Sequence, residues 1–210
     1  RLLFCKRACC QSNCAHLEYR MAKIISIILS CLSVCNTELL QADISNEGNW
    51  PAFRGNGNST TSLAELPLNW SDTEGIAWKV NLTGYGQSSP VIWGETVYVT
   101  STGGDGKEKL FIEAYDLASG GKQWVKEFEA SRKPKEVNDY ISRGAPTPVV
   151  DEAGVYAFFE SGDLVALDSS GGVRWQRSLT EEYGDFLGNH GVGSSLINTP
   201  DSIVLLVDHD

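Results

Sequence analysis

The side chains that could bind a metal or act as nucleophiles are concentrated at the start of this 210-residue chain. All six cysteines lie before residue 36, and four of them, from Cys5 to Cys14, follow the spacing Cys-x3-Cys-Cys-x3-Cys. Thiolates at such short spacings are typical zinc ligands. The stretch shows no apolar periodicity and precedes the only methionine, Met21, so we interpret residues 1–20 as a non-native upstream segment. The cysteine-free sequence that follows residue 42 predicts no thiol chemistry and no disulfide framework.

Three loops later in the chain hold the other side chains that could bind a ligand. They cover residues 84–87, 142–145 and 189–193, and each precedes a short apolar run. The candidate ligand-facing side chains are Tyr85, Gln87, Arg143 and His190. A histidine can act as a base or a ligand because its ordinary pKa lies near neutrality. No partner for His190 can be identified, so we assign neither a catalytic residue nor a metal ligand.

The elements that would position these loops contain a repeated motif. Ala114–Trp124 and Ala166–Trp175 each consist of a strand end, an aspartate, a Ser-Gly-Gly turn and a strand that opens on tryptophan. Trp78 precedes the first copy by a similar interval. A period of about 50 residues that contains several short strands is typical of a β-propeller blade.

The repeated residue types suit contacts between neighbouring blades. Glycine supplies the positive φ angles of a tight turn, and aspartate accepts backbone N–H bonds across it. We expect the tryptophan to lie flat between two blades, where its indole N–H finds an acceptor. The predicted blade-docking residues are Trp78, Asp116, Gly120, Trp124, Asp168, Gly171 and Trp175.

Apolar alternation and turn residues predict the individual strands. Two whole blades are expected, with strands at 88–93, 96–100, 109–115 and 122–128, and then at 146–150, 155–159, 163–167 and 173–179. Strands at 194–197 and 203–208 begin a third blade, and residues 77–82 form an orphan closing strand. The predicted fold class is all-β, an incomplete β-propeller of four-stranded antiparallel blades. Ile203–Val207 would be an exposed sheet edge.

The first part of the chain predicts export. Residues 21–42 have the basic start, short apolar run and small final residue of a secretory signal peptide. The apolar run of about 12 residues is too short to span a bilayer. A lipid anchor on Cys31 is the alternative. Residues 43–75 predict an extended entry segment whose two anchors, Trp50–Phe53 and Leu66–Trp70, cover apolar edges, and residues 76–210 predict the partial propeller.

Charge narrows the possible partners. The formal net charge of −10 gives an acidic surface that repels phosphate, which argues against nucleic acid and anionic membranes. After signal cleavage we expect a periplasmic or secreted protein without a membrane span.

The repeated motif resembles a known family. With serine where threonine is usual, Ala114–Trp124 and Ala166–Trp175 resemble the Trp-docking motif of the pyrroloquinoline-quinone (PQQ) propeller repeat. Three further stretches resemble the opening of exported bacterial proteins of this type: Asn49–Gly55, Leu66–Ser71 and Gly86–Val91. The resemblance covers about residues 49–210. The family includes quinone-dependent alcohol and sugar dehydrogenases, and also non-enzymatic members such as the propeller lipoprotein of the outer-membrane protein assembly machinery.

The resemblance implies different site residues for these two classes. A quinone dehydrogenase is expected to have a catalytic aspartate, a Ca²⁺ site and, in several members, a vicinal cysteine pair. Cys9-Cys10 precedes the predicted signal peptide and does not match that pair. We therefore expect a non-enzymatic scaffold in the cell envelope, without an assigned cofactor, that binds other envelope proteins or a small ligand at the propeller rim. The alternatives are a dehydrogenase that uses PQQ and Ca²⁺ but whose catalytic half is missing here, and a carbohydrate-binding propeller.

Overall fold

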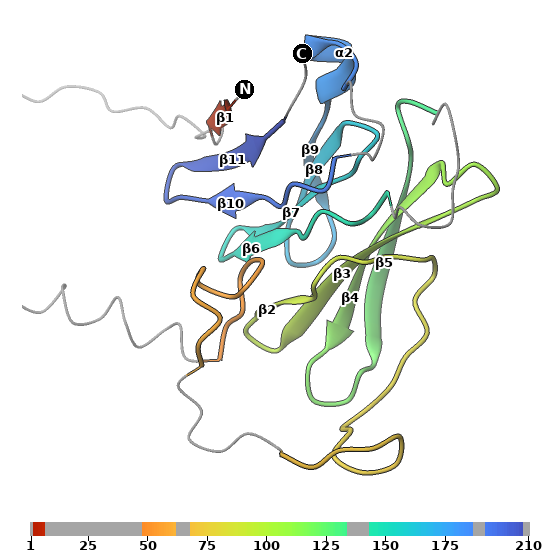
Figure 1. Ribbon diagram of the computed structural model, residues 1–210, viewed down its shortest axis with the longest axis vertical. Helices are drawn as coiled ribbons and strands as arrows, with labels where there is room; N and C mark the ends of the chain where they lie inside the picture. Colours follow the sequence, from red (N-terminus) through yellow and green to blue (C-terminus); the bar gives the residue numbers. More distant parts are fainter. Residues whose placement is uncertain (1, 7–47, 62–67, 134–142, 187–191, 208–210) are drawn as a thin grey trace, which may run out of the picture. The chain divides into compact units, whose positions relative to one another are not determined.

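A computed structural model describes the parts of the chain that carry the repeat (Figure 1). The described residues are 2–6, 48–61, 68–133, 143–186 and 192–207. The predicted signal peptide at 21–42 and the candidate His190 lie outside these ranges.

Two four-stranded antiparallel sheets confirm the two predicted blades. The first contains β2 (Val91–Trp93), β3 (Thr96–Gly103), β4 (Lys109–Asp116) and β5 (Lys122–Glu129). The second contains β6 (Val149–Asp151), β7 (Gly154–Phe158), β8 (Asp163–Leu167) and β9 (Val173–Ser178). In both sheets each strand pairs with the next one along the chain, as expected for a propeller blade.

The Ser-Gly-Gly turns join the third and fourth strands of both blades in the same way. Gly120 and Gly171 have φ angles of 69° and 82°, which a residue without a Cβ adopts without strain. Asp116 Oδ1 accepts a 2.8 Å bond from the backbone N–H of Ser119, and Asp168 Oδ1 likewise accepts from backbone N–H groups of its own turn. A register shift precedes each turn, so the repeated sequence produces a repeated local structure.

A third, smaller sheet follows the second blade. β10 (Ile197–Asn198) and β11 (Ser202–Leu206) form the predicted start of a third blade. β1 (Leu2–Lys6) pairs antiparallel with the other edge of β11, in the order β1-β11-β10. We expected an exposed edge at Ile203–Val207, but β11 is paired on both sides because β1 takes the place that β4 and β8 have in the whole blades.

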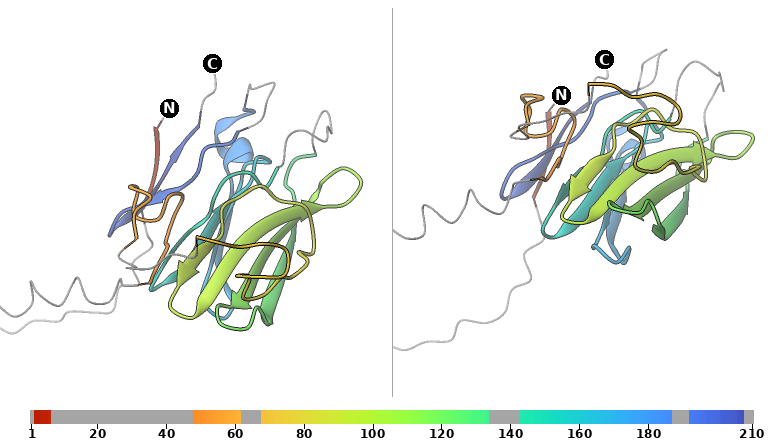
Figure 2. Two further views of the ribbon diagram at one scale, coloured as in Figure 1. Left: turned by 60° about the horizontal axis from the view of Figure 1, so that its bottom comes forward. Right: turned by 90° about the horizontal axis from the view of Figure 1, so that it is seen from below.

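Apolar side chains on both faces of the second sheet hold the three sheets together. On β7, Val155 and Ala157 belong to a buried cluster shared with the first sheet, whereas Tyr156 and Phe158 belong to a cluster shared with β11. Successive residues of a strand point to opposite faces, so an uninterrupted apolar strand buries itself on both sides. Figure 2 shows the two four-stranded sheets packed one against the other.

The entry segment confirms only one of its two predicted anchors. Trp50 pairs with Ile92 of β2 through backbone hydrogen bonds of 3.0 and 2.8 Å, and Asn49 Oδ1 accepts from the Gly94 N–H. Leu68 and Trp70 of the second anchor are instead 89% and 77% exposed, so that prediction is wrong for the described residues.

Two further local predictions differ from the structure. The short helix α2 (Leu179–Tyr183) begins where we expected β9 to continue, because Ser178 caps it by accepting a bond from the Glu181 N–H. Residues 77–82 form no strand. A strand needs a partner to complete its hydrogen-bond ladder, and in the described ranges none lies beside this segment.

Candidate functional site

Tryptophan side chains dock on the turn of the following blade. Trp78 Nε1 donates a 2.8 Å bond to the Leu117 carbonyl, and a Cβ added to Gly120 would lie 2.6 Å from the Trp78 ring. Trp124 Nε1 similarly donates a 3.0 Å bond to the Ser169 carbonyl beside Gly171. Each glycine therefore lets an indole ring lie directly on the backbone of the turn.

The third tryptophan of the series has only part of this arrangement. Trp175 contacts Tyr156 at 6.0 Å between ring centres, as Trp124 contacts Tyr98 at 5.8 Å. Within the ranges that the structure describes, the Trp175 indole N–H has no hydrogen-bond acceptor. Trp175 thus presents the face that docks on a following turn, without such a turn beside it in the described chain.

Two of the candidate rim residues occupy equivalent positions in their blades. Tyr85 forms two 2.8 Å backbone bonds with Thr102 at the end of β3, and the Arg143 carbonyl accepts a 3.1 Å bond from Glu160, just after β7. The backbone around Gly144 also approaches Thr102, so the two loops meet at this end of the first blade.

The side chains of these loops differ in their exposure to solvent. Tyr85 is 54% exposed, and its hydroxyl accepts a 3.0 Å bond from Gln87 Nε2. The Arg143 side chain is mostly buried and lies 4.0 Å from a carboxylate oxygen of Glu160. Tyr85 and Gln87 are therefore exposed to a ligand, whereas Arg143 is largely enclosed, and His190 lies outside the described residues.

A series of hydroxyl groups, which we did not predict, joins the inner strands. The Ser89 N–H donates 3.1 Å to Thr147 Oγ1, and the Thr147 N–H donates 3.1 Å to Ser195 Oγ. The three residues occupy the same place before β2, β6 and β10. The recurrence of serine or threonine two residues before each inner strand was the sequence signal for this contact.

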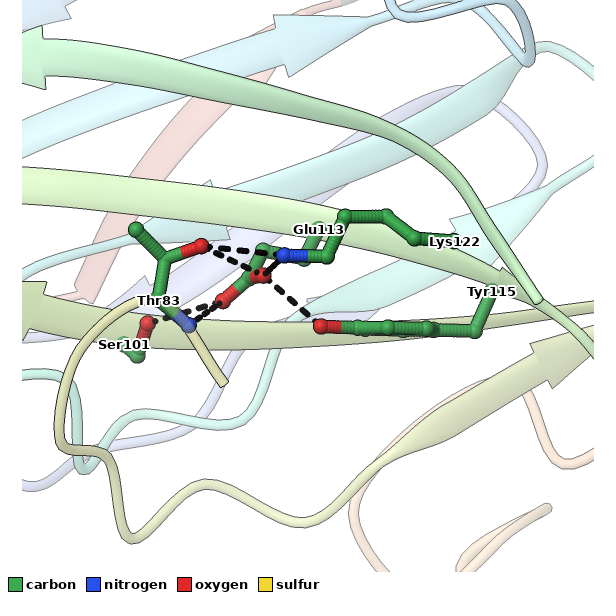
Figure 3. A network of polar contacts seen from close by, with 5 residues as sticks. All are labelled: Thr83, Ser101, Glu113, Tyr115 and Lys122. Carbon is green, nitrogen blue, oxygen red and sulfur yellow. Dashed lines mark hydrogen bonds and ion pairs between the residues drawn. The ribbon is translucent and has the colours of Figure 1, made fainter. Parts of the chain in front are cut away.

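The most complete polar site of the described chain surrounds Glu113, in the middle of β4 (Figure 3). Its side chain is fully buried and accepts five hydrogen bonds. Oε1 accepts from the Thr83 N–H at 2.9 Å and from Ser101 Oγ at 3.2 Å. Oε2 accepts from Thr83 Oγ1 at 2.8 Å, from Tyr115 OH at 2.7 Å and from Lys122 Nζ at 2.7 Å. The network holds Thr83, which directly precedes the first rim loop, against the first blade.

The surrounding donors determine the charge states of the site. Burial raises the pKa of Glu113, but hydrogen bonds from Lys122, Tyr115 and Thr83 outweigh it and bring the pKa below its ordinary value. The hydrogen bond to Glu113 raises the pKa of Lys122, and burial together with Glu113 raises that of Tyr115. At neutral pH the three groups are carboxylate, ammonium and neutral phenol. None of them is poised to transfer a proton near neutrality, which favours a positioning role over acid–base chemistry.

The Glu113 network predicts acid sensitivity. Because the folded pKa of Glu113 lies below its ordinary value of 4.5, the carboxylate stabilises the fold above pH 4.5. This contribution is lost as the pH falls through the folded pKa. We expect the urea midpoint of the wild-type chain to fall more steeply below pH 4.5 than that of Glu113→Gln. Equal slopes in the two proteins would contradict this assignment, since the other titrating carboxyls are present in both.

Comparison with the second blade shows that the repeat does not require this network. The β-sheet registers place Val165 at the position of Glu113, Leu167 at that of Tyr115 and Val173 at that of Lys122. A blade of this fold therefore forms with apolar residues at all three positions. The polar cluster is a feature of the first blade alone among the two whole blades.

The described residues do not match the donor set of a quinone dehydrogenase. Within those ranges, no three side chains of His, Cys, Asp or Glu come together to hold a metal ion. The buried carboxylate of Glu113 is already saturated by protein donors and has no free oxygen to coordinate Ca²⁺. We therefore derive no catalytic step through PQQ or Ca²⁺.

The chain has two blades, each a four-stranded antiparallel sheet, and a tryptophan of the first packs on the Ser-Gly-Gly turn of the second. These features define a PQQ-type β-propeller domain. A family model described as outer membrane protein assembly factor BamB matches residues 60–188. The chain belongs to this family. No curated protein matches the chain. No helix among the described residues is long and apolar enough to cross a membrane.

Proposed function

We propose that the chain is part of a non-enzymatic PQQ-type propeller that acts as an interaction scaffold in the cell envelope. Membership in a family described as an outer membrane protein assembly factor is the main support for this proposal. The partners would then be proteins that assemble the outer membrane, and the chain would be exported. The signal-like pattern of residues 21–42 agrees with export.

The structure suggests where such a partner could bind. The buried carboxylate of the first blade is used to hold the segment that ends at Thr83. This leaves the next residues, with exposed Tyr85 and its hydrogen-bonded Gln87, as a presented polar and aromatic surface. Tyrosine is enriched among the residues that dominate protein–protein binding energy, because it contributes a large rigid surface and a hydroxyl. We propose that Tyr85 is the central contact of this rim.

A binding measurement tests the rim. Tyr85→Ala is expected to weaken binding to the purified outer-membrane assembly machinery of the source cell about 10-fold or more, a loss of about 1.4 kcal/mol or more. Val173→Ala is the control, since Val173 is equally exposed, at 54%, but lies on the outer strand β9. Equal affinity of the wild type and Tyr85→Ala would exclude Tyr85 as a contact.

An activity measurement tests the non-enzymatic part of the proposal. The chain incubated with PQQ, Ca²⁺ and an artificial electron acceptor is expected to oxidise neither alcohols nor sugars. Dye reduction that depends on both PQQ and substrate would overturn the scaffold proposal in favour of a dehydrogenase. Retention on an immobilised glycan, in the absence of protein binding, would instead favour a carbohydrate-binding propeller.

A further inference from the structure

A second buried carboxylate lies in the second blade, at the start of β8. Asp163 is fully buried, and its Oδ2 atom accepts a 2.6 Å bond from Ser161 Oγ and a 3.0 Å bond from the Ser131 N–H. Its Oδ1 atom is also buried but has no hydrogen-bond partner within the described ranges. It is the one buried side-chain atom there with this property. An unpaired carboxylate oxygen away from water is costly, so its environment needs an explanation.

Asp163 resembles Glu113 in the kind of contacts it makes, although it lies two residues earlier on its strand, at the register position of Phe111. Both carboxylates lie on the third strand, and both accept a bond from a serine of their own blade. Each also accepts a backbone N–H from the segment that enters from the preceding part of the chain, Thr83 in one case and Ser131 in the other. Both carboxylates therefore bind the segment that precedes their blade, but from different positions on the third strand.

The two sites differ in their positive charge. Glu113 has the ammonium group of Lys122 at 2.7 Å. No described cationic side chain lies within ion-pair distance of Asp163, and the nearby Arg132 and Arg177 pair with Asp185 and Glu182. Within the described residues, Asp163 thus lacks the cationic partner that Glu113 has.

Hydroxyl groups lie on the residues that bond to Asp163 or pair with it in the sheet. Ser131 Oγ lies 2.8 Å from Ser178 Oγ, which lies 3.3 Å from Thr180 Oγ1, and Thr180 in turn donates 3.2 Å to the Ser161 carbonyl. Ser131 is exposed, so the cluster has access to solvent. Carboxylate, hydroxyl and carbonyl oxygens are the ligands that hard cations prefer.

We propose that Asp163 Oδ1 binds a hard cation of the alkali or alkaline-earth group, which replaces the ammonium group found beside Glu113. Further ligands would come from the hydroxyl groups of Ser131, which bonds Asp163 through its N–H, and Ser178, which pairs with Asp163 in the sheet. The site has one carboxylate, so it differs from a Ca²⁺ site built from several acidic side chains. The bound ion stabilises the junction between the end of the first blade and the second blade. This inference is independent of the proposed scaffold function.

Thermal unfolding of the metal-free 210-residue chain tests the site. Melting temperatures are measured at constant ionic strength in choline, sodium, potassium, magnesium and calcium chloride. At least one metal ion is expected to raise the melting temperature saturably over the choline value. The rise is about 5–10 °C at a hundredfold excess over its dissociation constant. Isothermal titration with the same ion should give one site per chain.

Variants decide whether the effect comes from this carboxylate. Asp163→Asn, which keeps the side-chain shape, is expected to abolish both the thermal shift and the titration heat. Asp168→Asn is the matched control, because Asp168 lies at the end of the same strand in an exposed turn, and it should keep the full response. If Asp163→Asn does not fold, Ser131→Ala retains the carboxylate and should need a higher ion concentration for the same shift. Equal melting temperatures in all five salts, or a full response in Asp163→Asn, would overturn the proposal.

Discussion

Glu113→Gln is expected to lower the free energy of unfolding by about 1–3 kcal/mol, because buried hydrogen-bond donors lose their acceptor. The loss stays below the value for a fully buried ion pair, since the Lys122 side chain is 38% exposed. The glutamine amide has nearly the shape of the carboxylate, but its NH2 group faces the donors on Tyr115, Lys122 and Thr83. These donors lose their acceptor while the site remains buried. Urea denaturation followed by circular dichroism at pH 7 measures the change.

Glu127→Gln is the control for this variant. Glu127 lies 2.8 Å from Lys109 on the same sheet, close to the 2.7 Å between Glu113 and Lys122. Both side chains of the control pair are about half exposed. An exposed pair contributes about 0.2–1 kcal/mol, so this variant should remain close to the wild type. A loss of less than 1 kcal/mol in Glu113→Gln would show that the buried network does not hold the first blade.

A double variant separates the pair from its surroundings. Glu113→Val combined with Lys122→Val introduces the residues that the second blade has at these positions. Replacing both members of a buried pair by apolar groups often costs less than removing one of them. We expect the double variant to lose less stability than the sum of the two single variants, with a coupling of about 1–3 kcal/mol.

Trp124→Ala is expected to cost about 2–4 kcal/mol, somewhat less than truncating a fully buried aromatic side chain, because Trp124 is partly buried. The indole ring packs on Gly171 and Tyr98, and its N–H bonds the Ser169 carbonyl of the second blade. Its removal leaves a cavity between the two blades and an unpaired carbonyl. Urea denaturation measures the loss.

A second variant at the same position separates the contribution of the ring from that of the N–H group, and a variant at Trp70 is the control. Trp124→Phe keeps an aromatic ring but removes the donor, so its additional cost from the lost bond is about 0.5–1.5 kcal/mol. Trp70→Ala is the matched control, since Trp70 is 77% exposed and its loss should change stability by about 0.5 kcal/mol at most. A loss at Trp124 as small as that at Trp70 would mean that the blades are held together without this docking contact.

For the candidate rim, the sequence repeat predicted the positions of the loops but not the exposure of their side chains. The equivalence of the loops around Tyr85 and Arg143 followed from the repeat, and the structure places both beside the ends of the second strands. Their exposure did not follow from the repeat, because the Arg143 side chain is only 11% exposed and lies beside Glu160 of its own blade. The sequence analysis did not single out Glu113, whose donors come from several parts of the chain. Thr83 is 30 residues away along the chain and reaches Glu113 only in the folded structure.

The eight strands of the two whole blades and their turns could be predicted from the sequence, because they depend on local periodicity, glycine and aspartate. The strand predicted at 77–82 does not form, since it depends on a partner strand. Contacts between segments far apart in the sequence were seen only in the tertiary structure. It placed β1 on β11, left Leu68 and Trp70 exposed, and brought Thr83 to Glu113 and Ser131 to Asp163. Contacts of this kind depend on the three-dimensional packing of neighbouring sheets, which the spacing of residues along one strand does not specify. For this reason the repeat identified the fold, whereas the two buried carboxylates became visible only in the structure.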